Sequence, residues 1–144
     1  MAEQTEGHIR IGAPPAKIMD VIADFDSYPQ WTGSVRQVEV VSTLPDGRPA
    51  QVRYLLDAGA IKDEYTLAYD WVSGTELRWH LVQGKILRAL DGVYLLEPDD
   101  DGQTSVSYRL RVEVSIPMIG MLRRKAEKVI VDTALKELKK RVEG

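Results

Sequence analysis

The stretch SVSYRLRVEV, residues 105–114, decides the fold because hydrophobic and polar side chains alternate strictly along it. Successive side chains of an extended strand point to opposite faces. Val106, Tyr108 and Leu110 therefore share one face, and Arg109 and Arg111 lie on the other. A strand with one apolar and one charged face is typical of an antiparallel sheet that covers a core on one side. We expect residues 105–114 to be such a strand.

The same period of two covers most of the chain that precedes this stretch. Five further alternating segments are separated by short turns, among them Asp46-Gly47, and Asp101-Gly102 precedes the last strand. Six consecutive strands with short connections predict an antiparallel meander. Residues 5–12 predict a separate first strand, and the proline pair at 14–15 begins a helix, since a first turn does not use the N–H that proline lacks. Residues 25–29 predict a brief helical turn.

Residues 117–144 predict the one long helix, which would cover the apolar face of the sheet. With 100° per residue, its apolar side chains gather on one side in the first half and about 150° further round in the second half. The helix should therefore bend near residues 131–134 or bury different sides along its length. The apolar side of the second half would form a homodimer contact if nothing in the same chain covered it. The residues of that contact would be Val131, Leu135, Leu138 and Val142.

Composition indicates one soluble domain spanning residues 1–144. Its 44% hydrophobic and 28% charged residues exclude a disordered chain, and the lack of cysteine excludes disulfides, thiolate metal sites and a cysteine nucleophile. The net charge of −3 argues against a nucleic-acid partner. The acidic N-terminus does not read as a signal peptide, and no apolar run approaches the ~18 residues of a transmembrane segment. We therefore expect a cytoplasmic protein.

The positive charge is concentrated at the C-terminal end. From Pro117 onward the chain has eight basic and four acidic residues, a net +4, which leaves −7 for the rest. A basic solvated helix face lying against an acidic body explains this distribution. The alternative is peripheral contact of the basic C-terminal helix with an anionic lipid surface.

The segment near the N-terminus at residues 11–31, IGAPPAKIMDVIADFDSYPQW, is the first of several stretches with a recognisable pattern. Asp91-Gly92 with Tyr94 in a late strand, Asp101-Gly102 before the last strand and LKKRVE at 138–143 follow. Together these stretches resemble the START-like (SRPBCC) superfamily, and within it the polyketide cyclase/dehydrase branch. The resemblance implies an α+β helix-grip fold like that of START and Bet v 1 proteins. In this fold a curved antiparallel sheet wraps around a long C-terminal helix, with short helices near the N-terminus.

Members of that superfamily enclose an apolar cavity between the sheet and the C-terminal helix, and they include lipid and quinone carriers, hormone receptors and aromatic cyclases. Three tryptophans and six tyrosines against one phenylalanine suit such a cavity, because their polar tips supply anchors within an apolar wall. The expected ligand-binding residues are the inward-facing aromatics, a tryptophan at the mouth and two residues of the helix: Trp31, Tyr54, Tyr65, Tyr69, Trp79, Tyr108, Leu122 and Ala126.

Catalytic chemistry has little support in the sequence. Only His8 and His80 are available as imidazoles, and no metal or nucleotide motif occurs, so we expect neither metal nor cofactor. Asp91-Gly92 interrupts an apolar strand, where glycine marks a bulge or a close backbone approach. Asp91 and Arg53 are weak catalytic candidates, because a register slip of one residue would turn them, with Glu64 and Arg88, into the cavity.

Three functions therefore stay open. The first is binding or carriage of a lipid, quinone or polyketide-like molecule, which requires only an apolar cavity with a few anchors. The second is an aromatic polyketide cyclase or dehydratase, which requires at least two titratable groups inside the cavity. The third is a protein-interaction module whose concave face docks a partner. Most charges fall on the wet face, which favours the first function.

Overall fold

The computed structural model describes residues 4–57, 62–115 and 120–144, and its elements follow the order expected from the sequence. Within these residues the strands are β1 (Thr5–Ile11), β2 (Val35–Thr43), β3 (Pro49–Asp57), β4 (Lys62–Ser73), β5 (Glu76–Gly84), β6 (Leu87–Pro98) and β7 (Thr104–Val114). The helical elements are α1 (Pro15–Ala23), the 3₁₀ turn η1 (Phe25–Ser27), α2 (Tyr28–Trp31) and α3 (Gly120–Glu143). No helix among the described residues is long and apolar enough to cross a bilayer.

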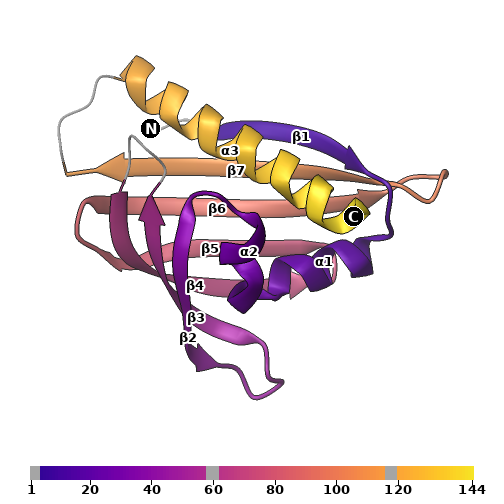
Figure 1. Cartoon of the computed structure of the whole chain (residues 1–144), viewed down its shortest axis with the longest axis horizontal. Helices are drawn as coiled ribbons and strands as arrows, with labels where there is room; N and C mark the ends of the chain where they lie inside the picture. The colour runs from indigo at the N-terminus through magenta and orange to yellow at the C-terminus, as the bar shows by residue number, and fades with distance from the viewer. Residues whose placement is uncertain (1–3, 58–61, 116–119) are drawn as a thin grey trace.

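The strands form one antiparallel sheet in the order β1-β7-β6-β5-β4-β3-β2 (Figure 1). The six strands after α2 form the expected meander, and β1 adds to the far edge by pairing with β7, Thr5 opposite Leu110 and Ile11 opposite Thr104. The α+β helix-grip fold is therefore confirmed.

The concave face of the sheet carries the hydrophobic side of the alternation. Inward residues such as Val52, Leu77 and Leu110 are buried, whereas their neighbours Arg53 and Arg78 on the opposite face are exposed. Burying apolar area at roughly 25 cal/mol per Å² makes this face the main source of stability. The period of two thus assigned the two faces of the sheet correctly.

Helix α3 runs diagonally across β1 and β7 at one side of the sheet (Figure 1). Its sheet-facing side is one continuous stripe of buried residues, namely Glu127, Val131, Leu135, Leu138 and Val142. Glu127, the first residue of this stripe, is charged. The apolar residues in the first half of the helix therefore mark a different side, which does not face the sheet. That other side includes Val129 and Ile130 and faces the cavity described below. The shift of the apolar stripe therefore reflects two different surroundings.

Glu127 is 1% exposed and ties the helix to both strands beneath it. One carboxylate oxygen accepts a hydrogen bond from the Thr5 hydroxyl at 2.8 Å, and the other accepts one from the Val112 N–H at 2.7 Å. β1 begins at Thr5, opposite Leu110, so no residue of β1 pairs with Val112. The Glu127 carboxylate accepts the hydrogen bond of the Val112 N–H in place of such a residue. The residues from Val131 to Val142 that were proposed as a homodimer surface are buried within this chain. The prediction that this side of the helix is available to a second copy was therefore wrong.

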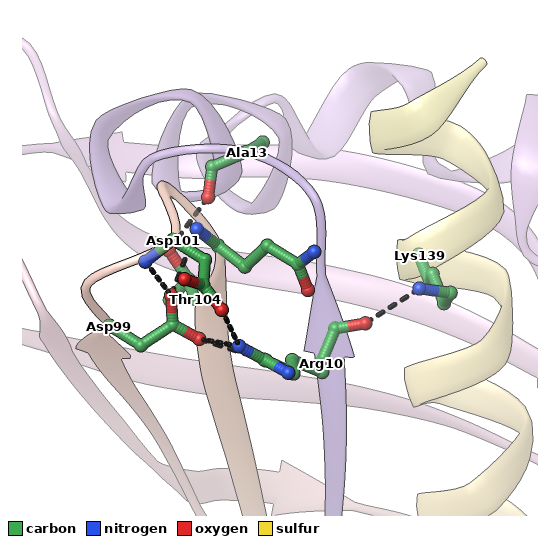
Figure 2. Close-up of polar contacts among 7 residues, drawn as sticks. Arg10, Ala13, Asp99, Asp101, Thr104 and Lys139 are labelled. Atoms are coloured by element: carbon green, nitrogen blue, oxygen red, sulfur yellow. Dashed lines mark hydrogen bonds and ion pairs between the residues drawn. The ribbon is translucent and has the colours of Figure 1, made fainter.

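The end of α3 is fixed at the opposite corner of the sheet. Figure 2 shows Lys139 donating to the carbonyl oxygen of Arg10, with an Nζ–O distance of 2.6 Å. In the same cluster Arg10 contacts Asp99 at 2.7 Å and Asp101 at 3.1 Å, and Thr104 donates to the Ala13 carbonyl at 2.7 Å. The Arg10 guanidinium lowers the pKa of Asp99. The aspartate-rich hairpin therefore serves as a polar clamp for β1.

Candidate functional site

A cavity of about 230 Å³ lies between the concave face of the sheet, α2 and α3. Its wall combines aromatic and aliphatic side chains from β3 to β7 with residues of both helices. This volume is slightly below the roughly 300–1,000 Å³ typical of sites for small organic molecules. A compact apolar molecule of about two fused rings therefore matches the space.

Six of the eight residues expected to bind a ligand do form the wall of this cavity: Trp31, Tyr54, Tyr65, Tyr69, Trp79 and Tyr108. Cross-strand pairing explains why they meet, because Tyr54 lies opposite Tyr65 and Tyr69 lies opposite Trp79 on adjacent strands. The sequence analysis missed Tyr28 and Tyr94 as wall residues. Tyr94 occupies an inward position of β6. Its neighbours Val93 and Leu95 are apolar as well, so the available signal was the count by two from the outward-facing Asp91.

The two helix residues in that set are not part of the wall. Leu122 is 54% exposed, and Ala126 is half-buried against the core. Both lie on the side of α3 that faces the cavity further on, but they precede the point at which the helix reaches it. Their places are taken by Val129, Ile130, Thr133, Ala134 and Glu137. The prediction identified the side of the helix that faces the cavity, but it placed the contact one or more helical turns too close to the N-terminal end of α3.

Gly92 lies where the indole of Trp79 rests directly on the backbone of β6. A Cβ atom at this position would come within 2.1 Å of the Trp79 ring, far below van der Waals contact. The register shift between β6 and β7 falls between Leu87 and Ala89 instead. Of the two roles expected for this glycine, close backbone approach is correct and the bulge is elsewhere. The glycine thereby sets the position of one cavity wall.

The weak catalytic candidates lie outside the cavity. Asp91 accepts a hydrogen bond from Arg111 at 2.9 Å on the opposite face of the sheet, and Arg53 pairs with Glu39 at 2.9 Å. Glu64 is 3.7 Å from Arg53 on that same face, and Arg88 is exposed. The register does not slip at Arg53, Glu64 or Asp91, so the alternation holds there. Arg88 lies in the irregularity between Leu87 and Ala89, where its side chain is exposed. None of these four residues belongs to the cavity wall.

The tyrosine hydroxyls divide into two groups. Tyr28 donates to the carbonyl oxygen of Ile22 at 2.5 Å, and the hydroxyls of Tyr54 and Tyr69 bond to each other. In the described part of the chain, the hydroxyls of Tyr65, Tyr94 and Tyr108 have no hydrogen-bond partner, although each residue is at least 92% buried.

Burial raises the pKa of all six phenols. For Tyr65 the neighbouring Tyr108 and the carboxylate of Asp63 raise the pKa further. The phenols therefore stay protonated at neutral pH, where they are hydrogen-bond donors and not bases.

Glu137 is the one wall residue, within the described residues, that carries a carboxylate, and none carries a lysine, arginine or histidine side chain. Its carboxylate accepts a hydrogen bond from the Gly33 N–H at 2.8 Å, which ties α3 to the segment after α2. Among the described residues no cluster of histidine or acidic side chains has a geometry for a metal ion. The described part of the wall can bind an apolar molecule, and its phenols and Glu137 can orient the polar atoms of that molecule.

Asp63 fixes one end of the cavity, and no pattern in the sequence indicates this role. This residue is 6% exposed, and its carboxylate accepts hydrogen bonds from the N–H groups of Glu64, Lys85, Ile86 and Leu87 at 2.8–3.1 Å. Lys85 and Ile86 form the turn between β5 and β6, and Leu87 begins β6 and belongs to the cavity wall. A carboxylate that satisfies four backbone donors holds this turn in one conformation.

Comparisons with known proteins agree with this geometry. A START superfamily protein from Mycobacterium smegmatis superposes with a TM-score of 0.91 at 23% identity, covering 97% of each chain. The Zhui aromatase/cyclase from Streptomyces sp. R1128 has a TM-score of 0.79 at 14% identity, covering 99% of this chain and 94% of its own. At such identities these structures establish the shared fold. No curated protein matches the sequence.

A family model described as polyketide cyclase / dehydrase and lipid transport matches residues 11–139. This range includes the helices α1 and α2, the whole meander and most of α3. The chain therefore belongs to the polyketide cyclase/dehydrase and lipid transport family.

Proposed function

We propose that this protein binds and carries a hydrophobic small molecule, such as a lipid, quinone or polyketide-like compound, in the cavity between its sheet and α3. The observation that carries the proposal is a predominantly apolar wall of aromatic and aliphatic side chains around the cavity. An apolar ligand gains roughly 25 cal/mol for every Å² of surface that it removes from water. Such a wall therefore supplies affinity without any reaction.

Binding without catalysis is favoured by the chemistry of the wall. A cyclase needs groups that abstract and return protons, and such groups work best when their pKa values lie near the working pH. The phenols have raised pKa values, and Glu137 is already bonded to the Gly33 N–H. The residues Asp91 and Arg53 lie on the outer face. Carriage or sensing of a ligand thus requires fewer additional assumptions than cyclisation.

The first test is binding of the neutral apolar dye N-phenyl-1-naphthylamine, whose fluorescence rises in apolar surroundings. Ala134→Trp should lower the affinity for the dye at least tenfold, because the indole fills the space that Ala134 leaves at the cavity wall. Ala126→Trp is the matched control: it makes the same change on the same helix outside the wall, and we expect it to alter affinity less than twofold.

Thr133→Trp repeats the test from the exposed rim of the cavity in case Ala134→Trp impairs folding. Near-ultraviolet circular dichroism and melting temperature report folding of each variant. Equal dye affinity in all folded variants would contradict binding in this cavity, as would the absence of dye binding by the unaltered protein.

We further propose that the first turns of α3 contact anionic lipid surfaces. Exposed Leu122 and Val129 lie there together with the exposed cation Lys125, and apolar and basic side chains side by side suit the headgroup region of a bilayer. Each lysine near an anionic membrane contributes on the order of 1 kcal/mol. Lys125→Glu should therefore weaken partitioning onto phosphatidylserine-containing vesicles by about tenfold.

Lys140→Glu is the control for that experiment, because it makes the same charge change at the opposite end of the helix. It should change partitioning less than twofold, and vesicles of phosphatidylcholine alone should bind neither form. Equal losses in the two variants would mean that only net charge matters and that the first turns are not the contact surface.

A further inference from the structure

Three protonated phenols that lack a partner present three hydrogen-bond donors to the cavity. Tyr65, Tyr94 and Tyr108 are 6%, 8% and 8% exposed, and all three belong to the cavity wall. The only fully enclosed side-chain polar atom without a partner in the described residues is Nε of Arg123, so these hydroxyls are open to the cavity. Buried polar groups in native proteins are satisfied in the great majority of cases. Their partner is therefore a molecule inside the cavity, either water or a ligand that displaces it.

The rings that carry these hydroxyls are held in place by one another. Tyr94 and Tyr108 lie opposite each other on β6 and β7, edge to face, with centroids 4.8 Å apart. The indole of Trp79 contacts both, at 5.2 Å and 5.5 Å between centroids. Tyr65 stacks on Tyr54 at 5.4 Å. Such contacts fix the positions of the hydroxyl oxygens before a ligand arrives, which reduces the entropy lost on binding.

The charge of the wall restricts what the hydroxyls can recognise. No lysine or arginine belongs to the wall in the described part of the chain, and the acid Glu137 does. A carboxylate ligand would thus be desolvated without a cation and repelled by Glu137. A hydroxyl ligand can also accept from the phenols, but it brings a donor of its own that needs a further acceptor in the wall. A carbonyl oxygen accepts two hydrogen bonds and brings no proton of its own.

We propose that the cavity selects neutral, largely apolar molecules that carry carbonyl oxygens, and that the hydroxyls of Tyr65, Tyr94 and Tyr108 donate hydrogen bonds to those oxygens. This inference rests on the proposed function and narrows its ligand class. The three tyrosines determine specificity for the carbonyl group. The aliphatic and tryptophan side chains supply affinity for the apolar part of any ligand. Proton transfer plays no part in this recognition.

Displacement of bound N-phenyl-1-naphthylamine by three naphthalenes of matched shape tests the inference. 2-Acetylnaphthalene carries the carbonyl, 2-isopropenylnaphthalene replaces its oxygen with a CH₂ group, and 2-naphthoate carries a carboxylate. The ketone should bind about threefold to tenfold more tightly than the alkene, the range expected for one net hydrogen bond. The carboxylate should bind most weakly of the three.

Tyr94→Phe, Tyr108→Phe and Tyr65→Phe keep each ring and remove only its hydroxyl. At least one of them should reduce the preference for ketone over alkene to less than twofold, while alkene affinity stays within twofold of the unaltered protein. The alkene therefore reports whether a variant still folds around a working cavity, and near-ultraviolet circular dichroism reports the same independently.

The outcomes separate this inference from the function on which it rests. Equal binding of ketone and alkene by the unaltered protein would overturn the carbonyl inference and leave apolar binding intact. The same holds if the ketone preference survives in all three variants, or if the carboxylate binds best. If neither the dye nor any of the three naphthalenes binds, both proposals fall.

Discussion

Asp63→Ala is expected to lower the free energy of unfolding by about 3–5 kcal/mol, the range seen when a buried charged hydrogen-bonding group is removed and its partners stay buried. The substitution leaves the N–H groups of Glu64, Lys85, Ile86 and Leu87 without their acceptor. Leu87 N–H is fully inside the protein, so water cannot replace the lost oxygen there without a movement of the turn. Urea denaturation followed by tryptophan fluorescence measures the change.

Asp70→Ala provides the matched control for this prediction. Asp70 lies on the same strand, is exposed and should change stability by less than about 0.5 kcal/mol. Asp63→Asn should fall between the two, because its single amide oxygen can accept only part of the four hydrogen bonds. A loss for Asp63→Ala as small as that for Asp70→Ala would show that the turn finds other acceptors.

Gly92→Ala should destabilise the protein by about 2–3 kcal/mol and also remove much of the cavity. The added methyl group meets the indole of Trp79 at 2.1 Å, and a rigid ring against a strand backbone can yield only by moving into the cavity space. We therefore expect at least a tenfold loss of affinity for N-phenyl-1-naphthylamine in the folded variant. Trp79→Leu in the same chain should recover part of the stability, because it removes the ring that the methyl group strikes.

Gly74→Ala is the corresponding control, since no atom lies within 4 Å of the Cβ that it would introduce. Its stability and dye affinity should match those of the unaltered protein within about 0.5 kcal/mol. If Gly92→Ala behaves like Gly74→Ala, the close contact between Trp79 and β6 does not define the cavity wall.

The alternation of side chains was sufficient to predict the sheet and five of the aromatic residues of the cavity wall. A period of two specifies which face each residue occupies, and a curved sheet brings the residues of one face together. Tyr54, Tyr65, Tyr69, Trp79 and Tyr108 were identified in this way. The same reasoning placed Asp91 and Arg53 outside, and only the idea of a slipped register made them candidates.

Other features depend on where elements lie relative to one another, which a local pattern does not contain. Leu122 and Ala126 were placed one or more turns too early, because the side of a helix follows from its period and its position along the sheet does not. Glu127 looked like a surface residue, since its partners Thr5 and Val112 are distant in the chain. Asp63 gave no signal, because its acceptor role becomes visible only with the turn at residues 84–87.

The pairing of β1 with β7 also determines when the protein can finish folding. Strands β2 to β7 form a meander whose contacts are local, whereas Thr5 must find Leu110 across nearly the whole chain. Closing so long a loop carries an entropic cost that only the completed pairing repays, which slows folding. Helix α3 packs mainly on β1 and β7, so it has its full docking surface only after that pairing. During synthesis on the ribosome, the first strand of this protein must therefore wait for the last one.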